Sequence, residues 1–233
     1  MTHKLNELNR VLKRNAAEFA PVLAIDLCQD NVCCLDFTAN NQLLQNTDLR
    51  NTAAFNEAVQ QMLQVNNAIA GVGGYFEDRF IYRRSTHFDA AAESRNLHLG
   101  VDIWIEAGAP VYTPLPATVH SFQDNANFGD YGPTIILQHE LEGITFYTLY
   151  GHLNRQSLDG LEVGKHFAKG DKIAEVGPFP ENGDWPPHLH FQVMASMKGR
   201  SGDFPGVATV SEKEHYQLIC PDPNLILKCS HLS

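Results

Sequence analysis

The chain has 233 residues, 43 % hydrophobic and 19 % charged, a composition typical of a globular protein with a sizeable core. Seventeen basic and 27 acidic residues give a formal charge of −10. This balance disfavours binding to nucleic acid or to an anionic membrane surface, because both need an excess of Lys and Arg. No apolar run approaches the ~20 residues that span a bilayer. The sequence therefore predicts that neither nucleic acid nor a membrane is a partner.

The N-terminal part combines helical and extended patterns. Apolar residues recur at helical spacing over residues 4–19, and Pro21 ends that segment. Two short apolar runs, Val22–Leu27 and Val32–Phe37, are separated by four mostly polar residues. This arrangement predicts a hairpin.

Asn51 or Thr52 is predicted to cap a second helix, and the AGVGG of residues 70–74 is interpreted as a break. Short β-rich runs then alternate with Gly, Pro and Asp turns almost to the end, as in an antiparallel sandwich or barrel. We predict a mainly β protein with an α-helical N-terminal part. Its divisions are a helical and hairpin region (1–74), an antiparallel β-sheet or barrel-like domain (75–228) and a tail (229–233).

The cysteines and the N-terminal composition bear on the cellular setting. The number of cysteines is odd, and no CxxC spacing of a thiolate zinc site occurs. Cys33 and Cys34 lie inside an apolar run and are interpreted as small buried hydrophobes. No apolar stretch of signal-peptide length follows the basic residues near the N-terminus. These features predict a reducing, cytoplasmic setting.

Three of the eleven histidines and one aspartate stand out by their spacing, whereas most histidines, His139 included, are interpreted as structural. His188 and His190 alternate on a predicted strand, so both imidazoles face the same side. His98 and Asp102 lie in HLGVD, an extended segment by its composition. HxH and HxxxD are weak signals separately. Together they supply the donors of an open zinc site, with three protein ligands and one position for water.

Further candidates lie near these motifs. His152, in YTLYGHLN, is either a strand-end residue in a turn or a base or oxyanion stabiliser beside the metal. Tyr150 and Trp185 are candidates for contact with substrate. The arginines before HLGVD are interpreted as a solvated or salt-bridged surface, with an acidic substrate group as the alternative partner. They are Arg79, Arg83, Arg84 and Arg95.

Five motifs follow one another in the order HLGVDI, GAPVYTPLPATV, TIILQHELEGITFYTLYGHL, GLEVGKHFAKGDKIAEVG and PPHLHFQV. In this order they resemble the lysostaphin/LytM-type zinc metalloendopeptidases, whose members commonly cut peptide cross-links in bacterial cell walls. The resemblance covers roughly residues 95–195. The sequence departs from the family at Ala117, where Gly is frequent, and at the WPP before HLH, where a small residue is common.

The resemblance implies an antiparallel β fold and hydrolysis of a peptide bond, of glycyl or peptidoglycan type, through a water activated by Zn²⁺. It implies that His98, Asp102 and His190 are the zinc ligands. It also implies that His152 and His188 are the catalytic pair, without saying which of the two is the base.

A second resemblance concerns segments such as GGYFEDRFIYRRSTHF, DYGP, NGDWPPHLHFQV and CPDPNLIL. They are similar to a peptidase-like domain inside large intracellular proteins, between a kinase-like domain for small molecules and a class III aminotransferase-like domain. This likeness extends over about residues 72–227. It implies a substrate other than the cell wall.

The predicted partner is thus a peptide or amide substrate, and no oligomeric state is predicted. Two alternatives stay open beside the metallopeptidase. One is an intracellular hydrolase of a small amide on the same zinc site. The other is a non-catalytic binding module of the same fold. A cupin-type protein fits poorly, because cupins combine HxH with a Glu and a more distant His in another order.

Overall fold

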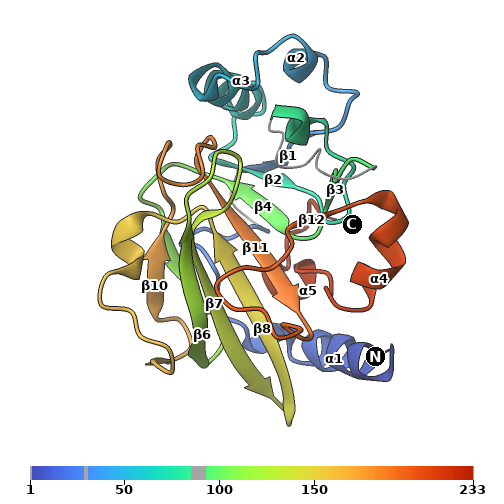
Figure 1. Ribbon diagram of the computed structural model, residues 1–233, viewed down its shortest axis with the longest axis vertical. Coiled ribbons are helices and arrows are strands. Elements are labelled where there is room, and N and C mark those ends of the chain that lie inside the picture. Colours follow the sequence, from blue (N-terminus) through green and yellow to red (C-terminus); the bar gives the residue numbers. More distant parts are fainter. Residues whose placement is uncertain (1, 29–30, 85–92, 233) are drawn as a thin grey trace.

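The computed structural model describes residues 2–28, 31–84 and 93–232, and an eight-stranded sheet forms its centre (Figure 1). The strand order is β1-β2-β4-β11-β8-β7-β6-β9. The strands, in chain order, are β1 (Val32–Cys34), β2 (Ala70–Gly73), β3 (Leu97–His98), β4 (Val101–Trp104), β5 (Pro110–Tyr112), β6 (Ala117–Asn125), β7 (Gly132–Leu141), β8 (Ile144–Gly151), β9 (His166–Phe167), β10 (Lys172–Glu175), β11 (His188–Met194) and β12 (Val207–Ala208).

The mainly β prediction is confirmed, and the large sheet is mixed. Its pairs are antiparallel except for β1 with β2. Within the described residues the sheet is open, since its order begins at β1 and ends at β9, so the barrel-like alternative is not realised. Two small two-stranded sheets, β10 with β5 and β12 with β3, accompany it.

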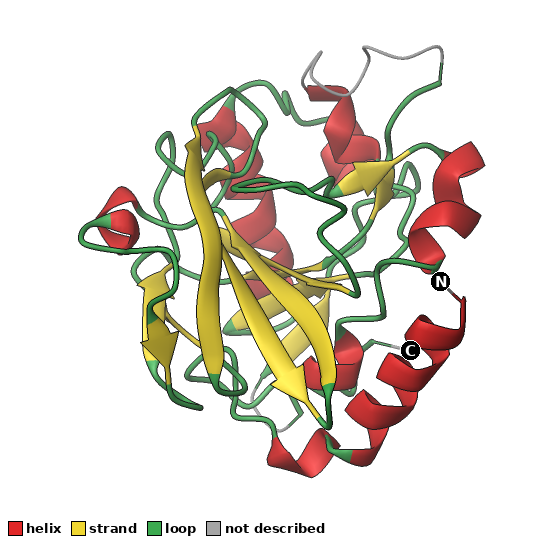
Figure 2. Ribbon diagram, turned by 60° about the horizontal axis from the view of Figure 1, so that its bottom comes forward, coloured by secondary structure: helices red, strands yellow, loops and turns green. Residues whose placement is uncertain are grey.

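The helices lie around the sheet (Figure 2). They are α1 (Thr2–Arg14), α2 (Gln42–Gln45), α3 (Thr52–Val65), α4 (Lys213–Gln217) and α5 (Asn224–Leu227), with 3-10 helices η1 (Ala16–Glu18), η2 (Phe80–Arg84), η4 (Arg155–Leu158) and η5 (Val210–Glu212). The predicted first helix is present, and the predicted cap of the second is Asn51, whose side chain accepts a hydrogen bond from the Ala54 backbone N–H at 3.2 Å. No helix of the described residues is long and apolar enough to cross a membrane.

The predicted hairpin of residues 22–37 is wrong. Val32–Cys34 pairs in parallel with Ala70–Gly73, whereas Leu23 makes only an isolated bridge to Val111. A parallel pair needs a long crossover, which the helical residues between β1 and β2 supply. The break predicted at residues 70–74 is therefore a strand, and its Gly71 leaves room for the side chain of Leu35.

The two faces of the sheet serve different purposes. Val101, Ile103 and Phe191 point into the largest core cluster, which α1 covers with Leu5, Leu8 and Leu12. The alternate residues of the same strands point to the opposite face. On that face α2 and α3 pack a second cluster around Phe37, Phe55 and Trp104, and the C-terminal segment packs a third around Leu149, Met194 and Ile219. A strip of sheet between these two clusters is left for polar residues.

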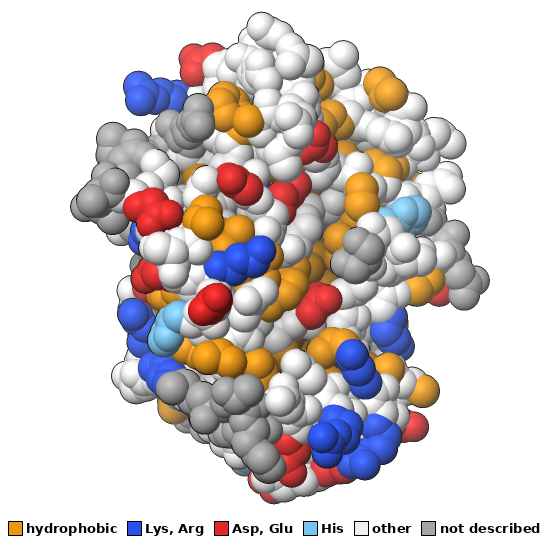
Figure 3. Space-filling model, turned by 90° about the vertical axis from the view of Figure 1, so that its right-hand side faces the viewer, with side chains coloured by type: hydrophobic (Ala, Val, Ile, Leu, Met, Phe, Trp, Pro, Cys, Tyr) orange, Lys and Arg blue, Asp and Glu red, His pale blue; other side chains and the backbone are white. Residues whose placement is uncertain are grey.

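Strands β1 and β2 extend the sheet across the boundary predicted near residue 75, because β2 pairs directly with β4. At the other end of the chain, β12 pairs with β3. Figure 3 shows acidic, basic and hydrophobic side chains interspersed on one face of the molecule.

Candidate metal centre and active site

The register of β4 and β11 brings Asp102 and His190 together. They are direct cross-strand partners in an antiparallel pair, so their side chains leave the sheet on the same face. His98 ends β3 and reaches the same point. Gly100 allows the close approach, because a Cβ there would lie 2.6 Å from Cε1 of His190 and 2.8 Å from the Phe191 carbonyl oxygen.

Three donor atoms converge at this point. His98 Nε2 lies 3.0 Å from His190 Nδ1 and 3.3 Å from Asp102 Oδ1, and His190 Nδ1 lies 3.0 Å from the same oxygen. All three residues are almost completely buried, with exposed fractions of 0 to 3 %. They form the one group of three or more metal-ligating side chains found among the described residues.

The outer hydrogen bonds of the two imidazoles define their tautomers. His98 Nδ1 donates to the Gly74 carbonyl at 3.0 Å. His190 Nε2 donates to Oε1 of Gln192 at 2.9 Å, and the amide of Gln192 is oriented by its own donation to the Pro205 carbonyl at 3.1 Å. In the neutral rings, His98 Nε2 and His190 Nδ1 then carry lone pairs. Two imidazole lone pairs and a carboxylate face one another, an arrangement that fits a bound cation.

The electrostatics favour the metal-binding protonation states. Burial lowers the pKa of His98 to about 3, and the charge of Arg79 acts in the same direction. Burial alone would raise the pKa of Asp102, but the electrostatic interactions with His98 and Arg79 outweigh it and hold this pKa well below its usual value. The imidazole of His98 is therefore neutral and the carboxylate ionised over the whole neutral range.

His152 and His188 lie side by side next to this cluster, with ring centroids 4.2 Å apart. His188 comes from β11, two residues before His190, and its Nε2 lies 3.7 Å from Asp102 Oδ2. His152 follows β8 with a φ of 61°, a left-handed conformation that is uncommon for residues other than glycine. Its backbone is held there by hydrogen bonds of 2.8 Å from its N–H to the Tyr131 carbonyl and from Gly177 to its own carbonyl.

Both imidazoles of this pair are oriented in the same way. Nδ1 of His152 donates to the Asn182 carbonyl, and Nδ1 of His188 donates to the Pro186 carbonyl, each at 2.8 Å. Burial lowers the pKa of His188 to about 4 and that of His152 well below its usual value. Each ring therefore presents a neutral Nε2 with a free lone pair, which is the form that accepts a proton.

The five predicted polar residues thus lie together at one site. Of the two aromatic candidates, Trp185 and Tyr150, only Trp185 lines the pocket. Trp185 lines the pocket beside the histidines and donates from Nε1 to the Asp130 carbonyl at 3.2 Å. Tyr150 is fully buried in the core on the other face. It is the cross-strand partner of Phe191, and only its neighbour Gly151 is opposite His190. The prediction that Tyr150 contacts substrate is therefore wrong.

The sequence suggested that the arginines before HLGVD lie on the surface, but two of them are buried. Arg79 and Arg84 are 1 % and 2 % exposed. Arg79 pairs with Asp102, and Arg84 donates to Oγ1 of Thr52 at 2.8 Å. Arg95 is partly exposed and donates to the Val207 carbonyl at 3.0 Å. The side chain of Arg83 lies outside the described residues.

Two aromatic residues of the site escaped sequence interpretation. Tyr131 lines the pocket, and its hydroxyl lies 3.4 Å from His190 Nε2. Trp104 stacks on His188. Trp104 could have been predicted from the sequence. It lies two residues after Asp102 on β4, so the two side chains share one face of the strand.

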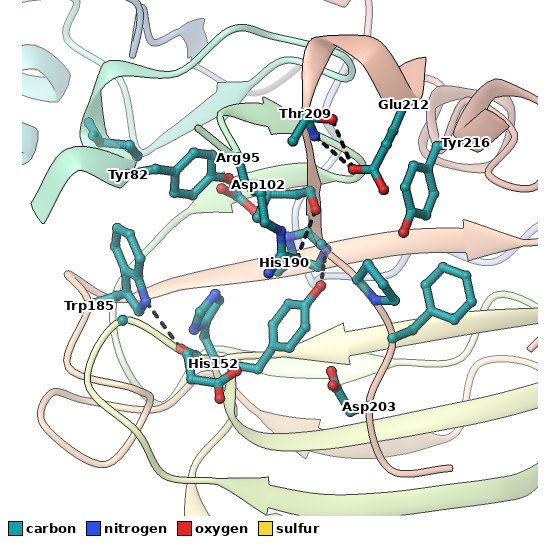
Figure 4. Close-up of a pocket in the computed structure, with 18 of the residues that line it drawn as sticks. Tyr82, Arg95, Asp102, His152, Trp185, His190, Asp203, Thr209, Glu212 and Tyr216 are labelled. Atoms are coloured by element: carbon teal, nitrogen blue, oxygen red, sulfur yellow. Dashed lines mark hydrogen bonds and ion pairs between the residues drawn. The ribbon is translucent and has the colours of Figure 1, made fainter. Parts of the chain in front are cut away.

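These residues open into a pocket of about 690 Å³. In Figure 4, Trp185 and His152 lie on one side of Asp102 and His190, and Thr209, Glu212 and Tyr216 of the C-terminal segment lie on the other. A volume of this size suits a small ligand or a short stretch of peptide.

A comparison with protein families matches residues 96–203 to the model of peptidase family M23. The matched residues, slightly less than half of the chain, are thus similar to peptidase family M23. Peptidases of this family are zinc-dependent hydrolases. The matched residues 96–203, called the M23 segment below, contain all five polar residues of the site. Arg79 and the pocket-lining residues within Phe204–Tyr216 lie outside this segment.

Solved structures similar to part of the chain include a zinc-containing peptidase from Vibrio cholerae, 27 % identical over 42 % of this chain and 27 % of that chain, with a TM-score of 0.32. The catalytic domain of lysostaphin from Staphylococcus simulans is 21 % identical over 52 % of this chain and 80 % of that chain (TM-score 0.35). A catalytic domain of the prophage-encoded M23 protein EnpA from Enterococcus faecalis is 19 % identical over 48 % of this chain and 75 % of that chain (TM-score 0.34). No curated protein matches the chain.

Proposed function

We propose that the chain is a zinc-dependent hydrolase of a peptide or other amide bond, in which His98, Asp102 and His190 hold the metal. The observation that carries the proposal is the convergence of two imidazole lone pairs and one carboxylate oxygen within 3.0 to 3.3 Å of one another. Two nitrogens and one oxygen from the protein leave a fourth position for water, as in catalytic zinc sites.

Zinc bound there supplies a water of lowered pKa and polarises the scissile carbonyl. The protein contributes the proton transfers. His152 and His188 both direct Nδ1–H to backbone carbonyls and present Nε2 to the pocket side of the site. One of them accepts the proton of the attacking water. The other lies beside it, with 4.2 Å between ring centroids, and would donate a hydrogen bond to the developing oxyanion once its own Nε2 has taken up a proton from solvent.

For the substrate, we propose a peptide first and a small amide second. The M23 family supports the peptide. Residues within Phe204–Tyr216, beyond the M23 segment, also line the pocket, and this added lining supports the small amide. The length of the substrate that is hydrolysed fastest distinguishes the peptide from the small amide.

The deciding experiment measures metal content by elemental analysis after zinc has been offered and the excess removed. We expect about one zinc per chain in the wild type and in His166→Ala, whose imidazole is exposed, and a loss in His190→Ala. A panel of glycyl peptides, cell-wall fragments and small amides then tests hydrolysis. A wild type without zinc, or a His190→Ala protein with full zinc and full activity, would contradict the proposal.

A further inference from the structure

The two oxygens of Asp102 have separate partners. Oδ1 faces His98 and His190, whereas Oδ2 accepts a hydrogen bond from Nη1 of Arg79 in a buried ion pair. We infer that Arg79 is a positioning residue that presents Asp102 to the metal through one oxygen only. The inference rests on the proposed function, because it assigns the centre of these residues to zinc.

Arg79 is itself held from several sides. Its Nε donates to Oε2 of Glu77 at 2.8 Å, and its guanidinium carbon lies 5.3 Å from the centre of the Phe37 ring and 5.9 Å from that of Tyr82. The side chain is 1 % exposed. A guanidinium enclosed in this way has one geometry and cannot follow a carboxylate that rotates.

The backbone around Arg79 is shaped to receive it. A Cβ at Gly73 would lie 2.5 Å from Nη2 of Arg79, so strand β2 leaves the guanidinium its space only with glycine at this position. The other oxygen of Glu77 accepts from the Phe37 backbone N–H at 3.3 Å, which ties the anchoring carboxylate to the N-terminal part. All these residues precede the M23 segment. The N-terminal part of the chain therefore completes the surroundings of the metal ligand.

The chemical consequence concerns the coordination number. A free carboxylate can bind zinc through one or both oxygens and so occupy the position that water needs. Since Arg79 engages Oδ2, Asp102 is restricted to Oδ1 and the fourth position stays open. A residue that only stabilised the fold would affect the stability of the protein without changing the geometry at the metal.

The test compares Arg79→Gln with wild type and with Arg155→Gln, which removes an exposed arginine from an ion pair with Asp124. The apparent zinc affinity is measured by competition with a chelator, and circular dichroism of the metal-free proteins checks folding. The visible spectrum with Co²⁺ in place of zinc reports the coordination number, because four-coordinate Co²⁺ absorbs more strongly than five-coordinate Co²⁺.

We expect Arg79→Gln to bind zinc about 10- to 100-fold more weakly and to show weaker Co²⁺ bands, with Arg155→Gln unchanged. Arg79→Lys restores the charge and is expected to recover part of the affinity. If Arg79→Gln does not fold, the double variant Glu77→Gln with Arg79→Gln replaces it, because it leaves no lone Glu77 carboxylate. The same losses are expected there.

The outcomes are distinct from those that decide the proposed function. A wild type that binds no zinc defeats that function and this inference with it. A wild type that binds zinc, together with a folded Arg79→Gln or double variant of the same affinity and the same Co²⁺ spectrum, leaves the hydrolase proposal standing and overturns the inference about Arg79.

Discussion

The indole of Trp104 stacks on the imidazole of His188, with ring centroids 4.0 Å apart and ring planes inclined by 16°. The two residues are direct partners on β4 and β11. Phe37 also stacks on the indole, at 4.6 Å between centroids. The aromatic packing of the N-terminal part is therefore continuous with an imidazole of the pocket, and it restrains that imidazole in addition to the hydrogen bond from Nδ1.

The first prediction concerns this stack. Trp104→Leu keeps an apolar side chain but removes the ring that supports His188. We expect kcat to fall by about 10²-fold, because a misplacement on the order of 1 Å is enough for such a loss. Zinc content stays at the wild-type level. Trp104→Phe retains a ring and serves as the matched control in steady-state kinetics. Equal kcat values for the two variants would show that stacking does not matter.

A second prediction separates metal binding from proton transfer. His152→Ala and His188→Ala are expected to keep zinc but to lose activity by about 10²- to 10⁴-fold each. Because the two imidazoles act on one proton transfer and one oxyanion, the double variant is expected to be little worse than either single one. Elemental analysis and kinetics on all three proteins test this. Losses that multiply in the double variant would argue for independent roles.

The third prediction is that zinc stabilises the fold. Without a cation, the lone pairs of His98 Nε2 and His190 Nδ1 face the Asp102 carboxylate at 3.0 to 3.3 Å, and zinc would neutralise this concentration of electron density. At free zinc 100 times above its Kd, the free energy of unfolding is expected to rise by about 2.7 kcal/mol. Denaturant unfolding with and without zinc measures it. His190→Ala is the control, and an equal zinc effect in this variant would place the binding elsewhere.

The fourth prediction uses His139, which is buried away from the metal centre between the Pro116 carbonyl and the Thr148 hydroxyl. Burial lowers its pKa to about 4, and the hydrogen bond to Pro116 opposes the shift. The unfolded chain, with a pKa near 6.5, binds the proton first as the pH falls. The stability contribution is therefore complete above about pH 6.5 and is lost progressively as the pH falls to about 4.

Between pH 7 and pH 5 this residue alone is expected to cost the folded state about 2 kcal/mol. Urea unfolding of the metal-free protein at both pH values measures the loss. The other buried histidines contribute in the same direction, so the comparison is with His139→Gln, which is expected to lose about 2 kcal/mol less over this interval. Parallel pH dependences of the two proteins would exclude His139 as a contributor.

The sequence was most informative where local periodicity decides the structure. His188 and His190 share a face because every second residue of a strand does, and Asp102 joins them through the cross-strand register. The same periodicity makes small errors costly. Tyr150 and Gly151 are adjacent, yet Tyr150 faces the core and Gly151 is opposite His190. A candidate one residue away therefore lies on the other face of the sheet.

Features that depend on contacts between distant segments were not predictable in this way. The parallel pairing of β1 with β2 requires a crossover, and adjacent apolar runs suggested a hairpin instead. Arg79 has the sequence environment of a surface residue. Its burial follows from Phe37, Gly73 and Glu77, which reach it from three places in the fold.

The pairing of β2 with β4 has a practical consequence for protein production. If the chain were cut before residue 75 to isolate the family domain, β4 would lose its neighbour on one side. The strand that carries Asp102 would then expose a row of unpaired N–H and C=O groups, and such an edge recruits strands from other molecules. An excised domain is therefore expected to aggregate, and expression of the domain should retain the strands β1 and β2 together with their crossover.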